Sequence, residues 1–436
     1  MPGLLGTLQT AKSGMAVSQA AIQTTSHNIS NLNTPGYSRQ RVEQTPGRPY
    51  TSISYNSYHG PGQLGTGANI NDITRIRNTF YDFQFRSESH EYGEESVKAD
   101  YYRSMENIFD EPSKNSISAS INDFFNSLNE LSKNPNSIGA KNVAIEKGKF
   151  LANNINSANS KLESLQEQLS FQSDNIVSDI NDKILAIKEL DKNIKLIQGA
   201  GKSPNDLLDQ RDNLMDDLSF KIDVNDELVK AVFDVEGKDS KTQEADLKAL
   251  KAKIDGKSLS GELSGVKIIH DEIEKYKDKL STLASAITTN INDVYKGGDK
   301  TKPDIFVAGS KGKLIDINPD IVEDVTKLEM TSDKSLELYD LRTKKVSIDG
   351  KDITISSYYN DTIQELGQSS QTAIRQEANN GKLLSSIDKS RMSVSGVSMD
   401  EEIVSLVQLQ HAYNASAKVI STIDSLLDVV INGLIR

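Results

Sequence analysis

Both ends of this chain carry apolar residues at coiled-coil spacing, and this feature most restricts what the chain can fold into. Between Met1 and Ser38 the only formally charged side chain is Lys12. Over the same stretch apolar or small residues recur in alternating steps of four and three, as in a coiled-coil seam: Leu4, Leu8, Ala11, Met15, Ser18, Ile22, Thr25, Ile29 and Leu32. This spacing predicts one helix of about eight turns, or two helices in line.

The C-terminal segment also carries apolar residues at coiled-coil spacing. Apolar or aromatic residues fall at every seventh position, with further ones between them: Met399, Leu406, Tyr413, Ile420, Leu427 and Leu434, interleaved with Ile403, Ala417 and Ile431. A parallel row widens the same face: Leu409, Ala412, Val419, Ile423, Leu426 and Val430. A helix with so wide an apolar face needs more than one neighbour.

We therefore predict that the two terminal helices pair as a coiled coil and also form an assembly interface with other copies of the chain. The residues expected at this interface are Leu4, Leu8, Met15, Ile22, Ile29, Leu32, Ile403, Leu406, Tyr413, Ile420, Leu427 and Leu434. The alternative is that both are ordinary core helices of one globular domain. Their outer faces are mostly Ser, Thr, Gln and Asn rather than Lys and Glu, which favours burial against other subunits.

Composition excludes several classes of function. A chain of 436 residues is long enough for two or three domains. Its net charge of -12, without a basic stripe, argues against a nucleic-acid partner. With no cysteine there are no disulfides, thiolate metal sites or cysteine nucleophiles. No signal peptide and no apolar run long enough to span a membrane is visible, so we expect no membrane partner.

The middle of the chain predicts a mainly α fold with a smaller β-rich module (α+β). An extended stretch, Ser38 to Asn71, follows the first helix. Further along the chain, a helical rod is expected from about Lys141 to Ile197, with a return helix from Asn205 to Leu218. Glu272 to Tyr295 is also expected to be helical. Strand-like alternation marks three further segments: Lys221 to Val235, Ile305 to Ile317 and Lys345 to Ser356.

These elements suggest three domains. The first is a terminal coiled-coil domain, residues 1–45 with 396–436, expected to line an inner tube. The second is a helical rod domain, residues 46–220 with 258–296 and 357–395. The third is a small β-rich outer module, residues 221–257 with 297–356.

Short patterns that could carry chemistry each lack a required part. Gly60 to Gly65 spells G-x-G-x-x-G but lacks a surrounding strand-to-helix unit. His270 begins H-D-E-I-E without a second histidine one turn away, so a zinc site is not expected. Asp316 opens a calcium-loop-like pattern in which Ile321 replaces the required glycine, and a strand end explains it better. We expect no catalytic, cofactor or metal site and no enzyme activity.

One motif is specific. Ser26 to Arg41, SHNISNLNTPGYSRQR, resembles the signature of the axial proteins of the bacterial flagellum, and its YSRQ ending is the form of the hook-associated protein 1 family. The motif residues are Asn33, Thr34, Pro35, Gly36, Tyr37, Ser38, Arg39 and Gln40. Asn205 to Leu218, NDLLDQRDNLMDDL, and Gly396 to Leu409, GVSMDEEIVSLVQL, are similar to stretches of the same family in the same order.

The resemblance implies a structural adaptor at the hook-filament junction. It implies a ring of copies, contacts with hook protein and with the second junction protein (hook-associated protein 3), and an export chaperone on the C-terminal helix. It also implies an extracellular flagellar location, reached through the flagellar type III apparatus without signal cleavage.

Three other interpretations stay open at this point. The nearest is another flagellar axial subunit, a rod or hook protein. The others are an enzyme inserted in a flagellar scaffold, and a helical scaffold or secreted adhesin unrelated to flagella.

Overall fold

A computed structural model of the chain describes residues 4–48, 65–233, 240–299, 301–310 and 312–432. These residues are mainly helical, with three small two-stranded antiparallel sheets. The predicted fold class, mainly α with a smaller β content, is confirmed. Contacts between residues divide the chain into two compact units, which are described separately below.

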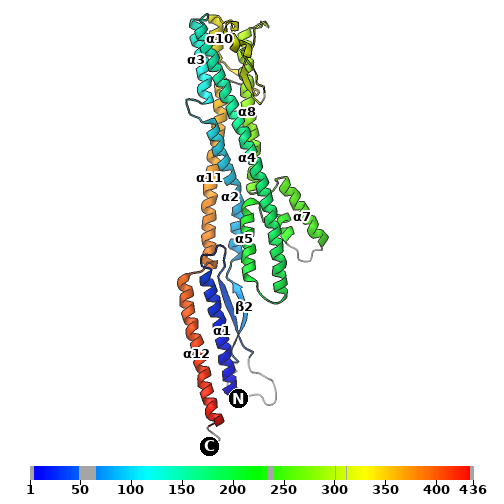
Figure 1. Cartoon of the computed structure of the whole chain (residues 1–436), viewed down its shortest axis with the longest axis vertical. Coiled ribbons are helices and arrows are strands. Elements are labelled where there is room, and N and C mark those ends of the chain that lie inside the picture. Colours follow the sequence, from blue (N-terminus) through cyan, green and yellow to red (C-terminus); the bar gives the residue numbers. More distant parts are fainter. Residues whose placement is uncertain (1–3, 49–64, 234–239, 300, 311, 433–436) are drawn as a thin grey trace. The chain divides into compact units, whose positions relative to one another are not determined.

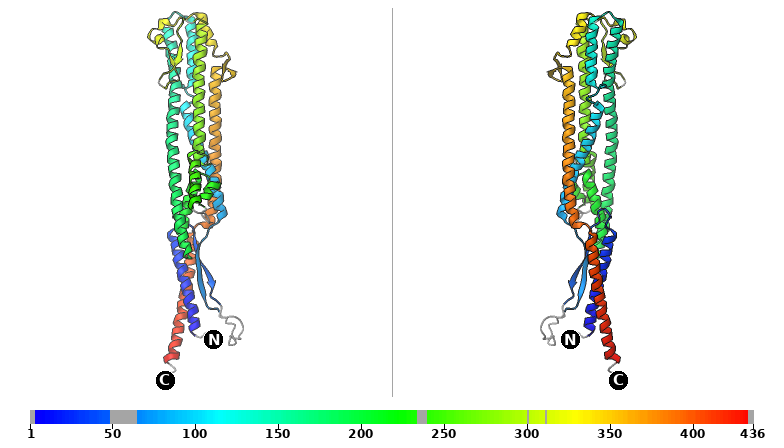
Figure 2. Two further views of the ribbon diagram at one scale, coloured as in Figure 1. Left: turned by 90° about the vertical axis from the view of Figure 1, so that its right-hand side faces the viewer. Right: turned by 90° about the vertical axis from the view of Figure 1, so that its left-hand side faces the viewer.

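The terminal unit comprises residues 1–88, 181–219 and 383–436. Helix α1 (Leu4–Ser30) and helix α12 (Met399–Asn432) lie side by side and antiparallel, so the start of α1 and the end of α12 lie at the same end of the pair (Figures 1 and 2). Strand β1 (Gln40–Pro46) pairs with strand β2 (Ala68–Arg75) as an antiparallel hairpin that contacts α1. The short helix α5 (Asn205–Lys221) belongs almost wholly to this unit.

The bundle unit comprises residues 89–180 and 220–382. Its long helices are α2 (Thr79–Phe109), α4 (Ile138–Gly199), α8 (Glu262–Lys296) and α11 (Ile355–Ser395), three of which also contribute to the terminal unit. Side-chain contacts join these helices into a closed ring of four: Tyr101 to Gln172, Gln166 to His270, Lys275 to Glu365, and Arg103 to Glu377. Fully buried side chains such as Leu162, Ile273 and Met105 fill the bundle.

Shorter elements complete the bundle unit. Helix α3 (Ile117–Lys133) packs against α10 (Ser332–Asp340). The hairpins β3 (Phe306–Ala308) with β4 (Ile315–Ile317) and β5 (Val346–Ile348) with β6 (Lys351–Ile353) contact α8. The remaining short helices are α6 (Glu227–Phe233), α7 (Ser240–Asp255), α9 (Pro319–Glu323) and the 3-10 turn η1 (Val325–Lys327).

Most predicted elements are confirmed, and one is wrong. The rod and the return helix are α4 and α5, and the two later strand segments contain β3 to β6. Of the strand predicted over Lys221 to Val235, the residues Glu227–Phe233 instead form helix α6, and residues 234 and 235 lie outside the described residues. Val229 and Val232 are three residues apart and both are buried, so they lie on one face of a helix, and α6 packs against α7. The three-domain division stays a prediction.

Candidate functional site

The motif noted in the sequence follows α1 as a tight turn. Backbone amides of Thr34 and Tyr37 donate to carbonyl oxygens three residues earlier. Gly36 has a φ of +73°, in the left-handed region, and a Cβ there would lie 1.7 Å from Oδ1 of Asn213 on α5. Glycine is therefore required twice, for the backbone conformation and for the close approach of α5.

Two residues after the turn bind α5. The backbone amide and the hydroxyl of Ser38 both donate to the carboxylate of Asp209, at 2.9 and 2.7 Å. The Gln40 side-chain amide donates to Asp206 at 2.9 Å. Ser38 is 1% exposed, so its hydroxyl has exchanged water for the carboxylate.

Arg39, between them, binds α12 instead. Its guanidinium lies 2.9 Å from Glu401 and 2.6 Å from Glu402, in the first turn of α12. Its backbone amide donates to the carbonyl of Ser395, the last residue of α11. Because alternate residues of an extended segment point in opposite directions, Ser38, Arg39 and Gln40 reach two different helices. We call the contacts of residues 37 to 40 the motif joint.

Asn28, near the end of α1, lies at the centre of the motif joint. Its amide nitrogen donates to the Gln40 carbonyl and to Glu402, at 2.9 and 3.0 Å. Its side-chain oxygen accepts from the backbone amide of Gln40 and from the Tyr37 hydroxyl, at 3.0 and 2.8 Å. The full hydrogen-bonding capacity of an asparagine is thus used. Burial, together with nearby carboxylates, raises the pKa of Tyr37 well above its usual value, so Tyr37 remains a donor.

Next to the motif joint lies a buried cluster of four arginines and four aspartates, which we call the ionic cluster. Its members come from β2 and the loop after it, α2, α5 and α11: Arg75, Arg77, Arg86, Arg391, Asp82, Asp209, Asp212 and Asp216. Their side chains are only 7–16% exposed. Each aspartate faces at least two arginines, which compensates for the loss of water around the charges.

Helix α5 organises this cluster. Asp209, Asp212 and Asp216 follow one another in steps of three and four, so they lie on one face of the helix. Burial alone would raise the pKa of Asp212, but the guanidinium groups of Arg77, Arg86 and Arg75 outweigh it and hold this pKa below its usual value. This cluster was not predicted from the sequence, although the spacing of the three aspartates was a signal for it.

The terminal helices meet along two rows of residues spaced by three and four. The α1 row is Ala11, Gly14, Ser18, Ala21, Thr25 and Asn28, and the α12 row is Glu402, Leu406, Leu409, Tyr413, Ser416, Ile420, Ile423 and Leu427. All of these residues are buried or half-buried. The α1 row consists of small residues, and a Cβ on Gly14 would be 3.4 Å from Oγ of Ser416. The two helices therefore pack closely.

The predicted interface residues fall in three places. On α12, Leu406, Tyr413, Ile420 and Leu427 lie in the row against α1, half-buried. The larger α1 residues lie beside the small row and are also half-buried: Leu4, Leu8, Met15, Ile22 and Ile29, with Leu32 in the same state just after α1. Ile403 is 46% exposed, and Leu434 lies outside the described residues.

A further apolar row on α12 is exposed. It also has three-and-four spacing, and we call it the outer row: Ala412, Ala415, Val419, Thr422, Leu426 and Val429. Leu426 is 48% exposed and Val429 64% exposed. A polar face that includes Lys418, Ser421 and Ser425 lies beside it. The outer row resembles a second coiled-coil seam without a partner in the described chain.

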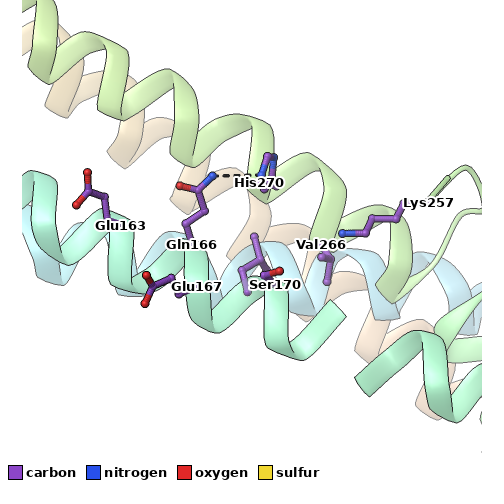
Figure 3. A pocket seen from close by; sticks show the side chains of 8 residues that line it. Glu163, Gln166, Glu167, Ser170, Lys257, Val266 and His270 are labelled. Atoms are coloured by element: carbon purple, nitrogen blue, oxygen red, sulfur yellow. Dashed lines mark hydrogen bonds between the residues drawn. The ribbon is translucent and has the colours of Figure 1, made fainter. Parts of the chain in front are cut away.

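The structure gives no support for chemistry at the other patterns. His270 lies beside an open pocket of about 410 Å³ between α4 and α8, where it contacts Gln166 at 3.2 Å (Figure 3). Within the described ranges no three His, Cys, Asp or Glu side chains are grouped to hold a metal, and no helix is long and apolar enough to span a membrane. Asp316 lies in β4, as the strand-end interpretation predicted. Of the glycine pattern only Gly65 lies within the described residues.

Comparisons with known proteins agree with this picture. Residues 102–231 match the family description "Flagellar hook-associated protein FlgK helical domain". Residues 8–37 match "Flagella basal body rod protein", and residues 389–433 match "Flagellar basal body rod FlgEFG protein C-terminal". The two terminal matches cover α1 with its turn and α12, the elements joined by the motif joint.

Two curated relatives align over nearly the whole chain. "Flagellar hook-associated protein 1" of Bacillus subtilis is 31% identical over 98% of this chain and 98% of its own length. The Escherichia coli protein of the same name is 21% identical over 98% and 99% of the two lengths. A solved structure, "The structure of the flagellar hook junction protein FlgK from Burkholderia pseudomallei", aligns with a TM-score of 0.41 and 17% identity over 52% of this chain and 47% of that chain.

The terminal helix pair, the motif joint and the bundle define a structural subunit of the bacterial flagellum. Within that class, the chain belongs to the flagellar hook-associated protein 1 family. The resemblance found in the sequence is confirmed, as is the prediction that the chain is a structural protein and not an enzyme. It is a hook-associated structural component of the bacterial flagellum, outside the cell.

Proposed function

We propose that this chain is the adaptor that joins hook to filament, and that copies of it form a ring through their terminal helices. The observation that carries this proposal is the outer row of α12. Its apolar residues keep three-and-four spacing over the half of the helix beyond Ala412, yet they are exposed. Large exposed apolar surfaces on such helices favour association, because burial removes them from water.

The half-buried larger residues of α1 support the same proposal, because part of each side chain is still exposed. Leu8, Met15, Ile22 and Ile29 lie on one side of the small row that contacts α12. A neighbouring copy can cover them without opening the α1 and α12 pair. A two-helix pair alone is only marginally stable. In a ring both helices bury more apolar surface, so we propose that they become fully ordered on assembly.

Glutamate substitutions on α12 test this assembly interface. In Leu426→Glu the new charge lies on the outer row, where assembly would bury it without a partner. In the control, Ser425→Glu, the same charge lies on the adjacent polar face. We expect Leu426→Glu to reduce the number of filaments per cell by about tenfold or more and Ser425→Glu to leave it unchanged. Equal filament numbers in the two strains would refute the interface.

A deletion strain tests the junction role itself. We expect it to keep its hook and to lack its filament. A rod or hook subunit, the alternative, would take the hook away as well. Hook protein below and hook-associated protein 3 above are the proposed neighbours, and labelling confined to the hook-filament boundary would separate this role from that of a general surface adhesin.

Export through the flagellar type III apparatus without signal cleavage completes the proposal. The exposed apolar residues of α12 need cover before assembly, and we propose that an export chaperone binds them. Secretion of a chain with an intact N-terminus, lost when residues of α12 are deleted, is the expected result.

A further inference from the structure

We propose that Glu402, through its bond to Asn28, sets the register in which α12 packs along α1. Glu402 is the first residue of the α12 row that faces α1, and Asn28 is the last residue of the facing α1 row. The two side chains are 2% and 1% exposed. A heptad seam tolerates sliding by seven residues unless a polar pair marks one position.

The register is the same along the pair. Gly14 lies opposite Ser416, and Asn28 lies opposite Glu402. These contacts are two heptads apart on both helices, in opposite directions, as antiparallel packing requires. Between them the seam contains only small, apolar or uncharged residues, so little else in it distinguishes one heptad from the next.

Both carboxylate oxygens of Glu402 are occupied. Oε1 lies 2.6 Å from Nε of Arg39, and Oε2 accepts from the Asn28 amide at 3.0 Å. Sliding by one heptad would place the carboxylate opposite Ala21, or place Leu409 opposite Asn28. The charge would then lose the Asn28 bond on a buried surface, which disfavours the slipped state by about a hundredfold or more.

Removing the Glu402 carboxylate should allow α12 to pack along α1 in more than one register while the two helices stay paired. In Glu402→Leu the row loses its one charged residue. Arg39 loses one partner but keeps Glu401 at 2.9 Å and is itself 25% exposed, so we expect the helix pair to persist with some loss of stability. Asn28 keeps its bonds to Tyr37 and Gln40, so the turn is preserved. Glu402→Gln is a milder variant: both of its partners are donors, so one of them must face the amide nitrogen.

Disulfide trapping measures the register, because the chain has no cysteine of its own. Gly14→Cys with Ser416→Cys reports the native register. Gly14→Cys with Leu409→Cys or with Ile423→Cys reports a slip of one heptad in either direction. With Glu402 present, we expect the native pair to cross-link at least about tenfold more than either slipped pair. In Glu402→Leu a slipped pair should reach a similar yield, and Glu402→Gln should lie between.

The control separates register from stability. Ile420→Ala removes a half-buried apolar contact from the same seam and should weaken the pair without raising a slipped yield. If Glu402→Leu loses helix content by circular dichroism, Glu402→Gln decides the question. A native-only pattern in a folded Glu402 variant would overturn the proposal.

The consequence for assembly rests on the proposed function, but the cross-linking does not, since it uses the purified chain. A slipped register fixes the α12 outer row in a different position relative to α1. Filament growth in the Glu402→Leu strain is therefore a separate readout. If Glu402→Leu gives slipped cross-links in the purified chain but the strain grows normal filaments, the role of Glu402 in the register stands. That result would count against assembly through the helix pair.

Discussion

The largest fully buried side chains of the described residues, such as Tyr276, Phe125 and Leu162, lie in the bundle unit. In the terminal unit, by contrast, the most buried groups include Asn28, Ser38 and Glu402, while apolar residues such as Val429 are exposed. The bundle unit therefore has the larger apolar core, whereas the terminal unit combines buried apolar residues such as Ile187 and Leu218 with buried polar contacts and keeps an apolar row of α12 exposed.

This difference suits a subunit that must assemble. Apolar contacts are strong but not directional, whereas hydrogen bonds and ion pairs require particular geometry. The motif joint and the ionic cluster hold α1, α5, α12 and the hairpin by directional contacts, so the exposed rows have fixed positions. The bundle unit needs no such device, because its ring of four helices buries its own apolar faces.

Breaking the ionic cluster should cause the largest difference in stability between the two units. Asp212→Ala leaves Arg75, Arg77 and Arg86 with fewer partners, and we expect a loss of roughly 3 kcal/mol in the terminal unit. Hydrogen exchange should rise in α5 and the β1 and β2 hairpin before it rises in α8. The exposed pair of Lys133 and Glu130 provides the control.

Glu130→Ala in that control should change stability by less than about 1 kcal/mol, because an exposed ion pair contributes little. If Asp212→Ala costs no more than Glu130→Ala, or loosens α8 as much as α5, the distinction between the two units fails.

Lowering the pH should cause a smaller loss of stability in the terminal unit. The pKa of Asp212 is lowered in the folded chain, so its stabilisation is present above the unfolded value of about 3.9 and is lost as the pH falls through the folded pKa. The stability difference between the natural chain and Asp212→Asn should thus be constant near neutral pH and shrink below about pH 4. Urea unfolding at several pH values measures it. A difference that grows in acid would contradict the pairing.

The sequence predicted long, periodic elements well because one helix face repeats over many turns. It located α1, α4 and α12, and it marked the motif by resemblance. The predicted α1 seam included Ala11, Ser18 and Thr25, which lie in the row against α12, but it did not include Gly14, Ala21 and Asn28 of the same row. The assignment of Leu8, Met15 and Ile22 to an assembly interface stays a prediction. Small residues carry little hydrophobic signal although they allow the closest packing. The ionic cluster joins segments far apart in sequence, so only three-dimensional structure brings Arg86, Asp216 and Arg391 together.

The smallest loss of stability should come from a substitution at Gly36, in the turn that follows α1. Gly36→Ala places a side chain at a positive φ and against Asn213, and we expect a loss of about 1 to 2 kcal/mol. In an Asn213→Ala background the contact is relieved, so the loss should fall to the conformational part, about 1 kcal/mol. Gly199→Ala is the control: it lies in α4 with nothing near its Cβ position, and it should be neutral or stabilising by about 0.5 kcal/mol. Denaturant unfolding of the four variants decides this. If Gly36→Ala behaves like Gly199→Ala, α5 does not approach the turn as closely as described, and the motif joint does not depend on glycine.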